Sequence, residues 1–388
     1  MAPFSFRTLA PYLVLFAALY AGFGVQSPYL PAFLAEHGLA PGLIGIVLAG
    51  ATAIKLVTAP AAGRVADRFG AARLVFAGCA LVAALAALGY LPAYGFWPLF
   101  GIALLQAAAL GPLAPLADSL VLPAAAPPRP GDRRGLDYGW VRGAGSGAFI
   151  LGSILSGQVV GTAGLAAAMG LNAGLLAAAA LWAPRVRPLP PRAAESATAP
   201  PSARHIGELL RLPAFRRVVL VAALILGSHA LHDGFAMIRW RAAGVMPGMA
   251  GLLWAESVAA EVVVFFALGR PLLDRLGTNG AAMLAAAAGI VRWTVSAETA
   301  GLPALALIQP LHGLTFALLH LACMRRLAEA VPPGLSATAL TLYGTVAIGA
   351  ASAVLSLASG MLYGAIGPVG FWIMAALCAL ALPIARRL

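Results

Sequence analysis

Charge is the scarcest property of this sequence. Only 10% of its residues are Asp, Glu, Lys or Arg, whereas 61% are hydrophobic, and the mean hydropathy is +0.91. Soluble domains carry about a quarter charged residues, so a water-soluble fold of this composition would leave most of its surface without polar cover. The composition therefore excludes an ordinary soluble protein and favours a chain that crosses a membrane several times.

Lysine and cysteine are nearly absent. The only lysine, Lys55, lies in the apolar stretch "AIKLV", which excludes a Walker A loop and hence ATP-driven pumping by this chain. The three cysteines stand alone in apolar stretches, without zinc or redox spacing, and no HExxH or GxSxG motif occurs. These absences predict a protein that is not an enzyme and that needs neither a cofactor nor a metal.

Long apolar runs make up most of the chain and predict twelve transmembrane helices of roughly 20 residues each, an all-α membrane protein. The first run follows Arg7 as in a signal peptide, but similar runs recur throughout, so we interpret it as the first span. The predicted spans lie near 9–34, 41–62, 74–94, 97–122, 140–163, 165–183, 214–236, 250–268, 280–297, 302–324, 336–360 and 366–384.

The basic residues lie mostly on one side of these spans. Of the 25 Lys and Arg residues, 21 fall in the even-numbered loops, in the first few residues of the spans that follow those loops, or in the two tails. Arg239 and Arg241 fall on the other side, and Lys55 and Arg292 fall within spans. By the positive-inside rule both termini are cytoplasmic. The net charge of +12 is thus a topology signal and does not indicate nucleic-acid binding.

Residues 185–213 interrupt the hydropathy with Pro, Arg, Ser and Ala, as a cytoplasmic linker would. They predict two six-helix bundles, at 1–184 and 214–388. "GRVADRFG" at 63–70 matches "GRPLLDRLG" at 269–277, and "SGQVVG" at 156–161 matches "SGMLYG" at 359–364. Two matches at nearly one offset suggest a duplicated unit, and hence pseudo-symmetric bundles.

The loop "GRVADRFGAAR" between spans 2 and 3 resembles the signature of the major facilitator superfamily. In that superfamily the loop helps to hold a cytoplasmic gate through charge pairs. The resemblance therefore implies a gating role for the residues of this loop and of its second copy: Gly63, Asp67, Arg68, Gly70, Arg73, Asp274 and Arg275.

Several longer segments resemble the 3-phenylpropionate permease branch of that superfamily, which is itself similar to the lactose permease. They are "PLAPLADSL", "LDYGWVRGAGSGAFILGS", "GSHALHDGFAMIRWRAAG", "LLWAESVAAEV", "VRW" and "LHGLTFALLHLACMRR". Together they cover nearly the whole chain. This resemblance implies a proton-coupled permease that works by alternating access.

Ionisable side chains occur inside the predicted spans, although each costs ~3 kcal/mol or more at the bilayer centre. They are Lys55, Asp118, His229, His232, Asp233, Glu256, Glu261, Arg292, His312 and His320. Such groups must face a wet cavity or one another. They either form static pairs that lock helices together or include a site that titrates, and the size and mixed signs of the set favour the second interpretation.

Span 8 carries two candidate proton sites, Glu256 and Glu261. They lie about 140° apart around a helix, so they cannot face the same spot. Glu261 is deeper in the span and matches the glutamate of the phenylpropionate branch, whereas Glu256 has no counterpart there. Arg292 and His312 match positions that the lactose permease uses in proton coupling, but Thr315 replaces its carboxylate. We therefore predict Glu261 as the proton carrier, with Glu256 in reserve.

The N-terminal half carries the predicted substrate site. Asp118 and Arg142 match the residues that hold sugar in the lactose permease, and Phe149 matches its stacking aromatic. An arginine and an aromatic wall would suit a phenyl-bearing acid. Lys55 either neutralises Asp118 or meets an anionic substrate. Further candidates are Tyr29, Gln26, Gln106, His229, Asp233 and Trp254. His229 and His232 share a helical face, but no third ligand is nearby, so no metal is expected.

The sequence thus predicts a secondary carrier in a bacterial inner membrane that imports a small organic acid with protons and works as a monomer. Span 5 lacks the Gly-Pro element of drug–proton antiporters, which favours uptake. An exporter or a sugar or nucleoside carrier on the same fold is the first alternative. A non-transporting sensor or scaffold is the second, and its function would survive neutral substitutions at the charges.

Overall fold

The computed structural model of the protein describes residues 6–125, 138–186 and 203–388, and all regular structure in these residues is helical. Within them, nine helices are long and apolar enough to cross a membrane, or ten with the bent pair Ala10–Gln26 and Leu30–Glu36. Two of the nine, Pro247–Glu298 and Ser336–Ala385, have 52 and 50 residues, enough for two crossings each. The fold is that of an all-α multi-pass membrane protein, and the length of these helices is compatible with twelve spans.

The chain divides into two compact units. The first holds the described parts of Met1–Gly38, Ala53–Glu195 and Pro247–Leu252, and the second holds those of Leu39–Thr52, Ser196–Met246 and Leu253–Leu388. Of the predicted linker at 185–213, residues 187–202 lie outside the described residues. Ala203–Arg211 form a short helix, α9, whose apolar residues gather on one face, so part of that linker is helical.

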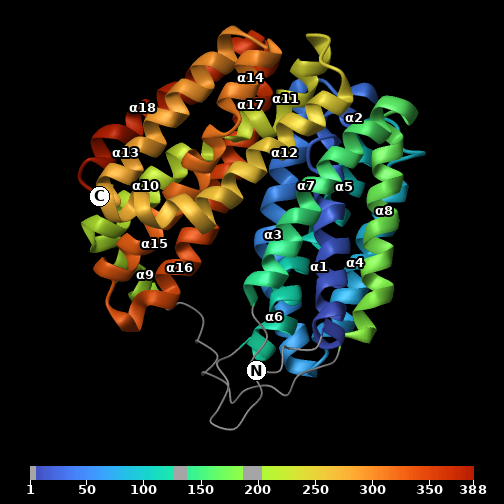
Figure 1. Ribbon diagram of the computed structural model, residues 1–388, viewed down its shortest axis with the longest axis horizontal. Coiled ribbons are helices and arrows are strands. Elements are labelled where there is room, and N and C mark those ends of the chain that lie inside the picture. The colour runs from blue at the N-terminus through green and yellow to red at the C-terminus, as the bar shows by residue number, and fades with distance from the viewer. Residues whose placement is uncertain (1–5, 126–137, 187–202) are drawn as a thin grey trace. The chain divides into compact units, whose positions relative to one another are not determined.

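The first unit consists of helices that run side by side (Figure 1). They are α1 (Phe6–Gln26), α2 (Leu30–Glu36), most of α3 (Pro41–Phe69), α4 (Ala72–Gly89), α5 (Phe96–Leu110), α6 (Leu113–Ala125), α7 (Tyr138–Ala163), α8 (Leu165–Trp182) and the 3-10 turn η1 (Ala183–Arg185). The helix α1 packs against α7 and α8, and α4 packs against α8. The hydroxyls of Ser153 and Ser156 donate to backbone carbonyls of α1, at 3.1 and 2.8 Å, so these polar groups are satisfied inside an apolar interface.

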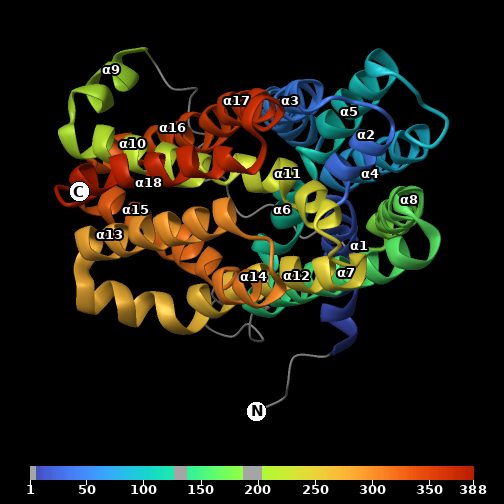
Figure 2. The ribbon, with the colours of Figure 1, turned by 90° about the horizontal axis from the view of Figure 1, so that it is seen from above.

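The second unit contains the remaining helices. They are α9, α10 (Pro213–Gly227), α11 (Ala230–Ala242), most of α12 (Pro247–Val263), η2 (Val264–Leu268), α13 (Gly269–Glu298), α14 (Leu302–Ile308), η3 (Gly313–Leu318), α15 (Leu319–Ala330), η4 (Pro333–Leu335), α16 (Ser336–Leu342), η5 (Tyr343–Ala350), α17 (Ala351–Ile366), η6 (Gly367–Gly370) and α18 (Phe371–Ala385). Figure 2 shows α10, α13, α15 and α18 together, and these helices pack pairwise. The rings of Trp293 and Phe371 stack where α13 meets α18.

The two copies of the loop motif end their helices in a similar way. Gly70 and Gly277 both have positive φ, at +58° and +67°. Only glycine takes such a positive φ without a steric cost, and glycine is the usual residue just after a helix C-terminus. After Gly70 the amide of Ala71 donates to the carbonyl of Ala66 at 3.0 Å, which closes the helix end. At Gly277 the conformation breaks α13 into two parts.

Large apolar side chains cover much of the outer surface. Val57, Trp97, Leu307 and Leu380 are all highly exposed, on four different helices. A monomer in water rarely exposes apolar surface on this scale. This surface suits the hydrocarbon of a bilayer, in agreement with the multi-pass fold.

Candidate functional site

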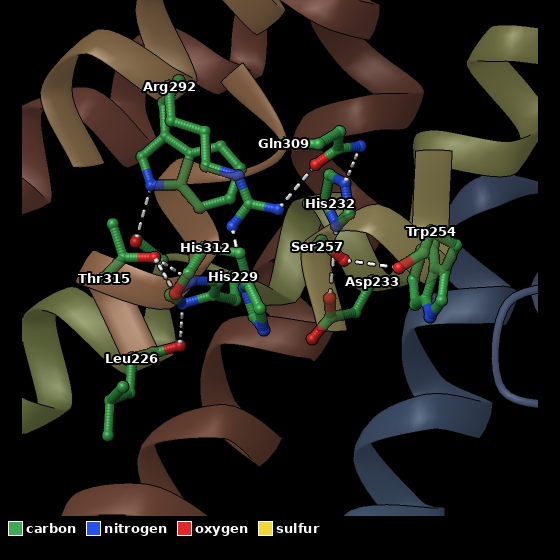
Figure 3. Close-up of polar contacts among 12 residues, drawn as sticks. Leu226, His229, His232, Asp233, Trp254, Ser257, Arg292, Gln309, His312 and Thr315 are labelled. Atoms are coloured by element: carbon green, nitrogen blue, oxygen red, sulfur yellow. Dashed lines mark hydrogen bonds and ion pairs between the residues drawn. The ribbon is translucent and has the colours of Figure 1, made fainter. Parts of the chain in front are cut away.

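Arg292 lies at the centre of a buried polar cluster in the second unit (Figure 3). Its side chain, on α13, is 1% exposed. Nη2 donates to Oε1 of Gln309 at 2.9 Å, and Nη1 lies 3.1 Å from Nδ1 of His312. The guanidinium carbon lies 4.6 Å from the centre of the Trp293 ring. No carboxylate of the described residues lies within 4.0 Å of this guanidinium, so neutral side chains surround a buried charge.

His312 connects this arginine to the predicted proton site. Nε2 of His312 lies 3.4 Å from Oε2 of Glu261 on α12. The approach depends on Gly313, because a β-carbon there would lie 2.6 Å from the carbonyl oxygen of Ala260. The chain follows each of these two residues with a π-helix, η3 after His312 and η2 after Glu261. π-Helical segments within α-helices occur frequently at functional sites, where the extra residue redirects side chains.

On its other side the cluster continues from Gln309 to a second acid. Nε2 of Gln309 lies 3.3 Å from Nε2 of His232, and Nδ1 of His232 lies 3.4 Å from Oδ1 of Asp233. The His232 ring stacks on Trp254, with centroids 5.2 Å apart. The His232 side chain is 6% exposed, whereas that of Asp233 is 60% exposed. Both belong to α11, so a buried histidine and an open carboxylate are neighbours in sequence.

The donors and acceptors of this cluster assign its protons. Oε1 of Gln309 accepts from Arg292, so its amide NH₂ faces His232, whose Nε2 must accept. The proton of neutral His232 is then on Nδ1, facing Asp233. In the same way Arg292 donates to Nδ1 of His312, which places the proton of that ring on Nε2, facing Glu261. Every donor in the cluster therefore points away from Arg292.

Three further residues predicted for the second half lie around this cluster. His229 contacts Thr315 through Nε2, at 2.9 Å, and the carbonyl of Leu226 through Nδ1, at 3.0 Å. Trp254 is 8% exposed and covers His232. Glu256 is half-buried and forms no hydrogen bond or ion pair with any residue that the structure describes. Of the two glutamates of α12, Glu261 is thus the one that contacts the arginine cluster.

A second polar cluster, in the first unit, surrounds Arg142. Nη1 of Arg142 donates to the hydroxyl of Tyr20 and lies 3.9 Å from Oδ1 of Asp118. The hydroxyl of Tyr138 donates to the same carboxylate oxygen at 2.8 Å. The side chains of Arg142 and Asp118 are 39% and 28% exposed, so this ion pair is partly open. An arginine held by a tyrosine and open on one side can bind a carboxylate.

Lys55 and Phe149 belong to the same unit. Lys55, on α3, is exposed and forms no ion pair with Asp118 or another described acid, so the predicted neutralisation of Asp118 by Lys55 is not seen. Phe149 follows Arg142 by two turns of α7 and lies on the same face, ~10 Å along the helix. Its ring is half-buried and stacks on no aromatic ring of the described residues.

The remaining polar candidates of the first unit are closed off by their own hydrogen bonds. Gln26 and Gln106 exchange reciprocal amide bonds of 2.6 and 3.1 Å, and Gln106 also donates to Asn172 at 3.3 Å. Their side chains are only 4% and 2% exposed. Tyr29 is 3% exposed and donates to the carbonyl of Pro247 at 2.8 Å. In this conformation these three residues hold helices together and do not line an open site.

The predicted gate residues differ in their contacts. Asp274 accepts a 2.8 Å hydrogen bond from Nη1 of Arg325. Through its Nε, Arg325 also pairs with Glu329, one turn further along α15. Arg73 donates to the carbonyls of Pro184, in η1, and of Val186 just after it, and it pairs with no acid among the described residues. The others, Gly63, Asp67, Arg68 and Arg275, form no ion pair within the described part of the chain.

Sequence reasoning missed several of these partners. Gln309, three residues before His312, bridges Arg292 to His232, and its signal was an amide in the apolar run "ALALIQPLHG". Tyr20 and Tyr138 had no distinguishing signal, because both look like ordinary membrane-span aromatics. Among the described residues, no group of three or more His, Cys, Asp and Glu could hold a metal ion.

Comparison with known proteins gives the family. Residues 9–374 match the MFS_1 like family. The chain is 32% identical over 376 residues to the probable 3-phenylpropionic acid transporter of Escherichia coli (strain K12), a match that covers 92% of this chain and 91% of that protein. The predicted resemblance is thereby confirmed.

Solved structures of transporters share the fold. The nucleoside transporter NupG superposes with a TM-score of 0.80 at 17% identity, over 98% of this chain and 97% of that one. A bacterial homologue of the human lysosomal transporter Spinster, in an inward-facing and unoccupied conformation, superposes with a TM-score of 0.72 at 14% identity, over 100% of this chain and 93% of that one. The chain belongs to the MFS_1 like family and is a membrane transporter, not an enzyme, with the major facilitator fold.

Proposed function

We propose that the protein is a proton-coupled symporter that imports a small organic acid, with an aromatic carboxylate as the first candidate. It works by alternating access, as a monomer, in a bacterial inner membrane with both termini in the cytoplasm. The observation that carries the proposal is the contact of Glu261 with His312, which in turn contacts the buried Arg292.

Proton coupling needs a carboxyl group whose charge matters to the rest of the protein. The Glu261 side chain is 25% exposed, so protons can reach it. Its partner His312 is 17% exposed and contacts Arg292, which is only 1% exposed. Protonation of Glu261 would remove one negative charge beside a buried positive one. The balance of charge in a low-dielectric site would change, which is what couples a proton to a conformational change.

The first unit offers groups that suit an aromatic acid. Arg142 is partly open and held in place by Tyr20, and Lys55 has no acidic partner among the described residues. Two cationic groups and the unstacked ring of Phe149 are chemically complementary to a carboxylate on a phenyl group. The relative at 32% identity is named for 3-phenylpropionic acid, which makes that acid the first substrate to test.

The test is uptake of labelled 3-phenylpropionate into proteoliposomes, with and without an inward proton gradient. Wild type should accumulate the acid only with the gradient. Glu261→Gln should exchange the acid across the membrane without accumulating it. Glu256→Gln is the matched control, because it makes the same change on the same helix at a side chain with no described partner, and it should accumulate normally.

Other results would identify the alternatives. Accumulation by Glu261→Gln as in wild type would refute the role of Glu261. If neither protein moves the acid, a panel of sugars, nucleosides and drugs with imposed gradients of both directions separates other importers from exporters. A sensor or scaffold would transport nothing, and its function in cells would survive both Glu261→Gln and Arg292→Gln.

A further inference from the structure

Arg292 stands midway between two carboxylates that do not touch it. In one direction the contacts run through His312 to Glu261, at 3.1 and 3.4 Å. In the other they run through Gln309 and His232 to Asp233, at 2.9, 3.3 and 3.4 Å. Figure 3 shows this second branch and the start of the first. Both end groups are open to solvent to different degrees, while the centre of the chain of contacts is closed.

We propose that Asp233 is a second proton-binding acid of the transporter, linked to Glu261 through this chain of contacts, and that Gln309 is the positioning residue that joins the two halves. Asp233 and Glu261 then share one positive charge. The inference deepens the proton coupling described above and rests on it only for the transport readout.

The net charge of these residues predicts how many protons they take up. With both acids ionised and both histidines neutral, the chain carries two negative charges and one positive charge, a net charge of minus one. One proton on either acid makes it neutral, and a second would leave the buried arginine uncompensated. Because a net charge is costly at low dielectric, the chain should take up one proton readily and resist a second.

The hydrogen-bond polarity supports a shared arginine. Arg292 donates in both directions, and each neutral relay passes a donor on to its acid, so the positive charge polarises both branches. When one acid is protonated, it has no negative charge left for Arg292 to compensate. The full charge of Arg292 then acts on the other acid and keeps it ionised.

Other titratable groups face the chain and belong to its balance. His229 lies with its ring 5.2 Å from that of His312, and Cys378 of α18 lies 3.4 Å from Ser228 beside Trp293. His320, at the start of α15, contacts the hydroxyl of Tyr343 at 3.3 Å. None of these groups is a carboxylate, so the charge of Arg292 is compensated within the described neighbourhood by Asp233 and Glu261.

Difference infrared spectroscopy of the reconstituted protein can follow the protonated carboxyl bands as the pH is changed. The band lost in Glu261→Gln identifies Glu261. Asp233→Asn removes a competing negative charge, so the pH at which Glu261 takes up its proton should fall, by about one unit or a tenfold change in affinity. In the Gln309→Leu background the same substitution should move that pH by less than half as much, because the link is cut.

Two results would overturn the proposal. If Asp233→Asn leaves the Glu261 band unmoved, the acids are not linked. If the shift is the same in both backgrounds, Gln309 does not join them. Gln309→Met provides a second way to cut the link with a longer flexible side chain, should Gln309→Leu fail to fold. Glu256→Gln should leave the Glu261 band where it is in wild type.

Transport gives an independent reading of the single shared proton. One proton with one monovalent acid is electroneutral, so uptake should respond to a pH gradient and remain unaffected by an imposed membrane potential. Potential-driven uptake would refute the one-proton balance. Because the infrared titration needs no substrate, a wrong substrate class would leave the band shifts intact, and the two failures are therefore distinguishable.

Discussion

The backbone of Gly313 lies against that of Ala260, so close that a β-carbon at position 313 would stand 2.6 Å from the Ala260 carbonyl oxygen. It would also stand 2.9 Å from Cγ2 of Val264. This close approach places His312 beside Glu261. The distance between two helices is thus part of the proposed proton site.

Gly313→Ala should push the π-helix η3 away from α12. We expect a loss of stability of ~1–3 kcal/mol, as for other overpacked contacts, and a loss of proton-driven accumulation. Thermal unfolding in detergent and uptake into proteoliposomes measure the two effects. Gly344→Ala is the matched control, because Gly344 also lies in a π-helix but has open space around its would-be β-carbon. Equal effects of the two substitutions would contradict the steric explanation.

Arg142→Lys should weaken binding of carboxylate substrates. Lysine keeps the charge but loses the planar group that contacts Tyr20 and approaches Asp118. We expect KM to rise at least ~10-fold, about 1.4 kcal/mol, with a smaller rise for Tyr20→Phe, which removes one hydrogen bond. Uptake kinetics with 3-phenylpropionate measure both. An unchanged KM for Arg142→Lys would move the substrate carboxylate elsewhere, with Lys55 the next residue to test.

Gln106→Leu separates a structural role from a binding role. The substitution leaves amide groups of Gln26 and Asn172 buried without their partner, which costs ~1–3 kcal/mol. We therefore expect a lower Tm and an unchanged KM. The opposite pattern, a raised KM at constant Tm, would show that Gln106 contacts substrate in another conformation of the transporter.

Asp274→Asn and Arg325→Gln should act as one change. The pair is exposed, so each substitution should change the stability of the protein very little. If the pair holds the loop in one state of the transport cycle, both variants should alter the uptake rate in the same direction. The double variant should differ little from either single one. Additive rate changes would mean that the two residues act independently.

Most of the fold follows from properties that are visible in the sequence. Apolar runs of membrane length show where helices lie, and the repeated Asp-Arg-x-Gly motif indicates how two of them end, at Gly70 and Gly277. Lipid constrains the backbone so strongly that composition alone almost determines the class of fold. The exception is the region 185–213, where a polar composition hid the short helix α9.

The site could be predicted only in part. Arg292, His312 and Glu261 stand out because charge is rare in apolar spans. The sequence does not show which of these residues contact one another, because that depends on helix packing. Gly313 allows the close approach of the helices, and the π-helices η2 and η3 determine the directions in which the side chains point. Gln309 was missed because a neutral amide has no charge to flag it, although its two-way bonding joins the cluster.

The extra residue in η3 has a consequence beyond the proton site. The same continuous helical stretch carries His312 at one end and, thirteen residues later, Arg325, which contacts Asp274. Removing one residue from η3 would rotate Arg325 by about 100° relative to His312, so both contacts could not be kept. The extra residue of η3 therefore sets the rotation of Arg325 relative to His312. With it, the same helical stretch can contact Glu261 inside the membrane and Asp274 at the loop at the same time.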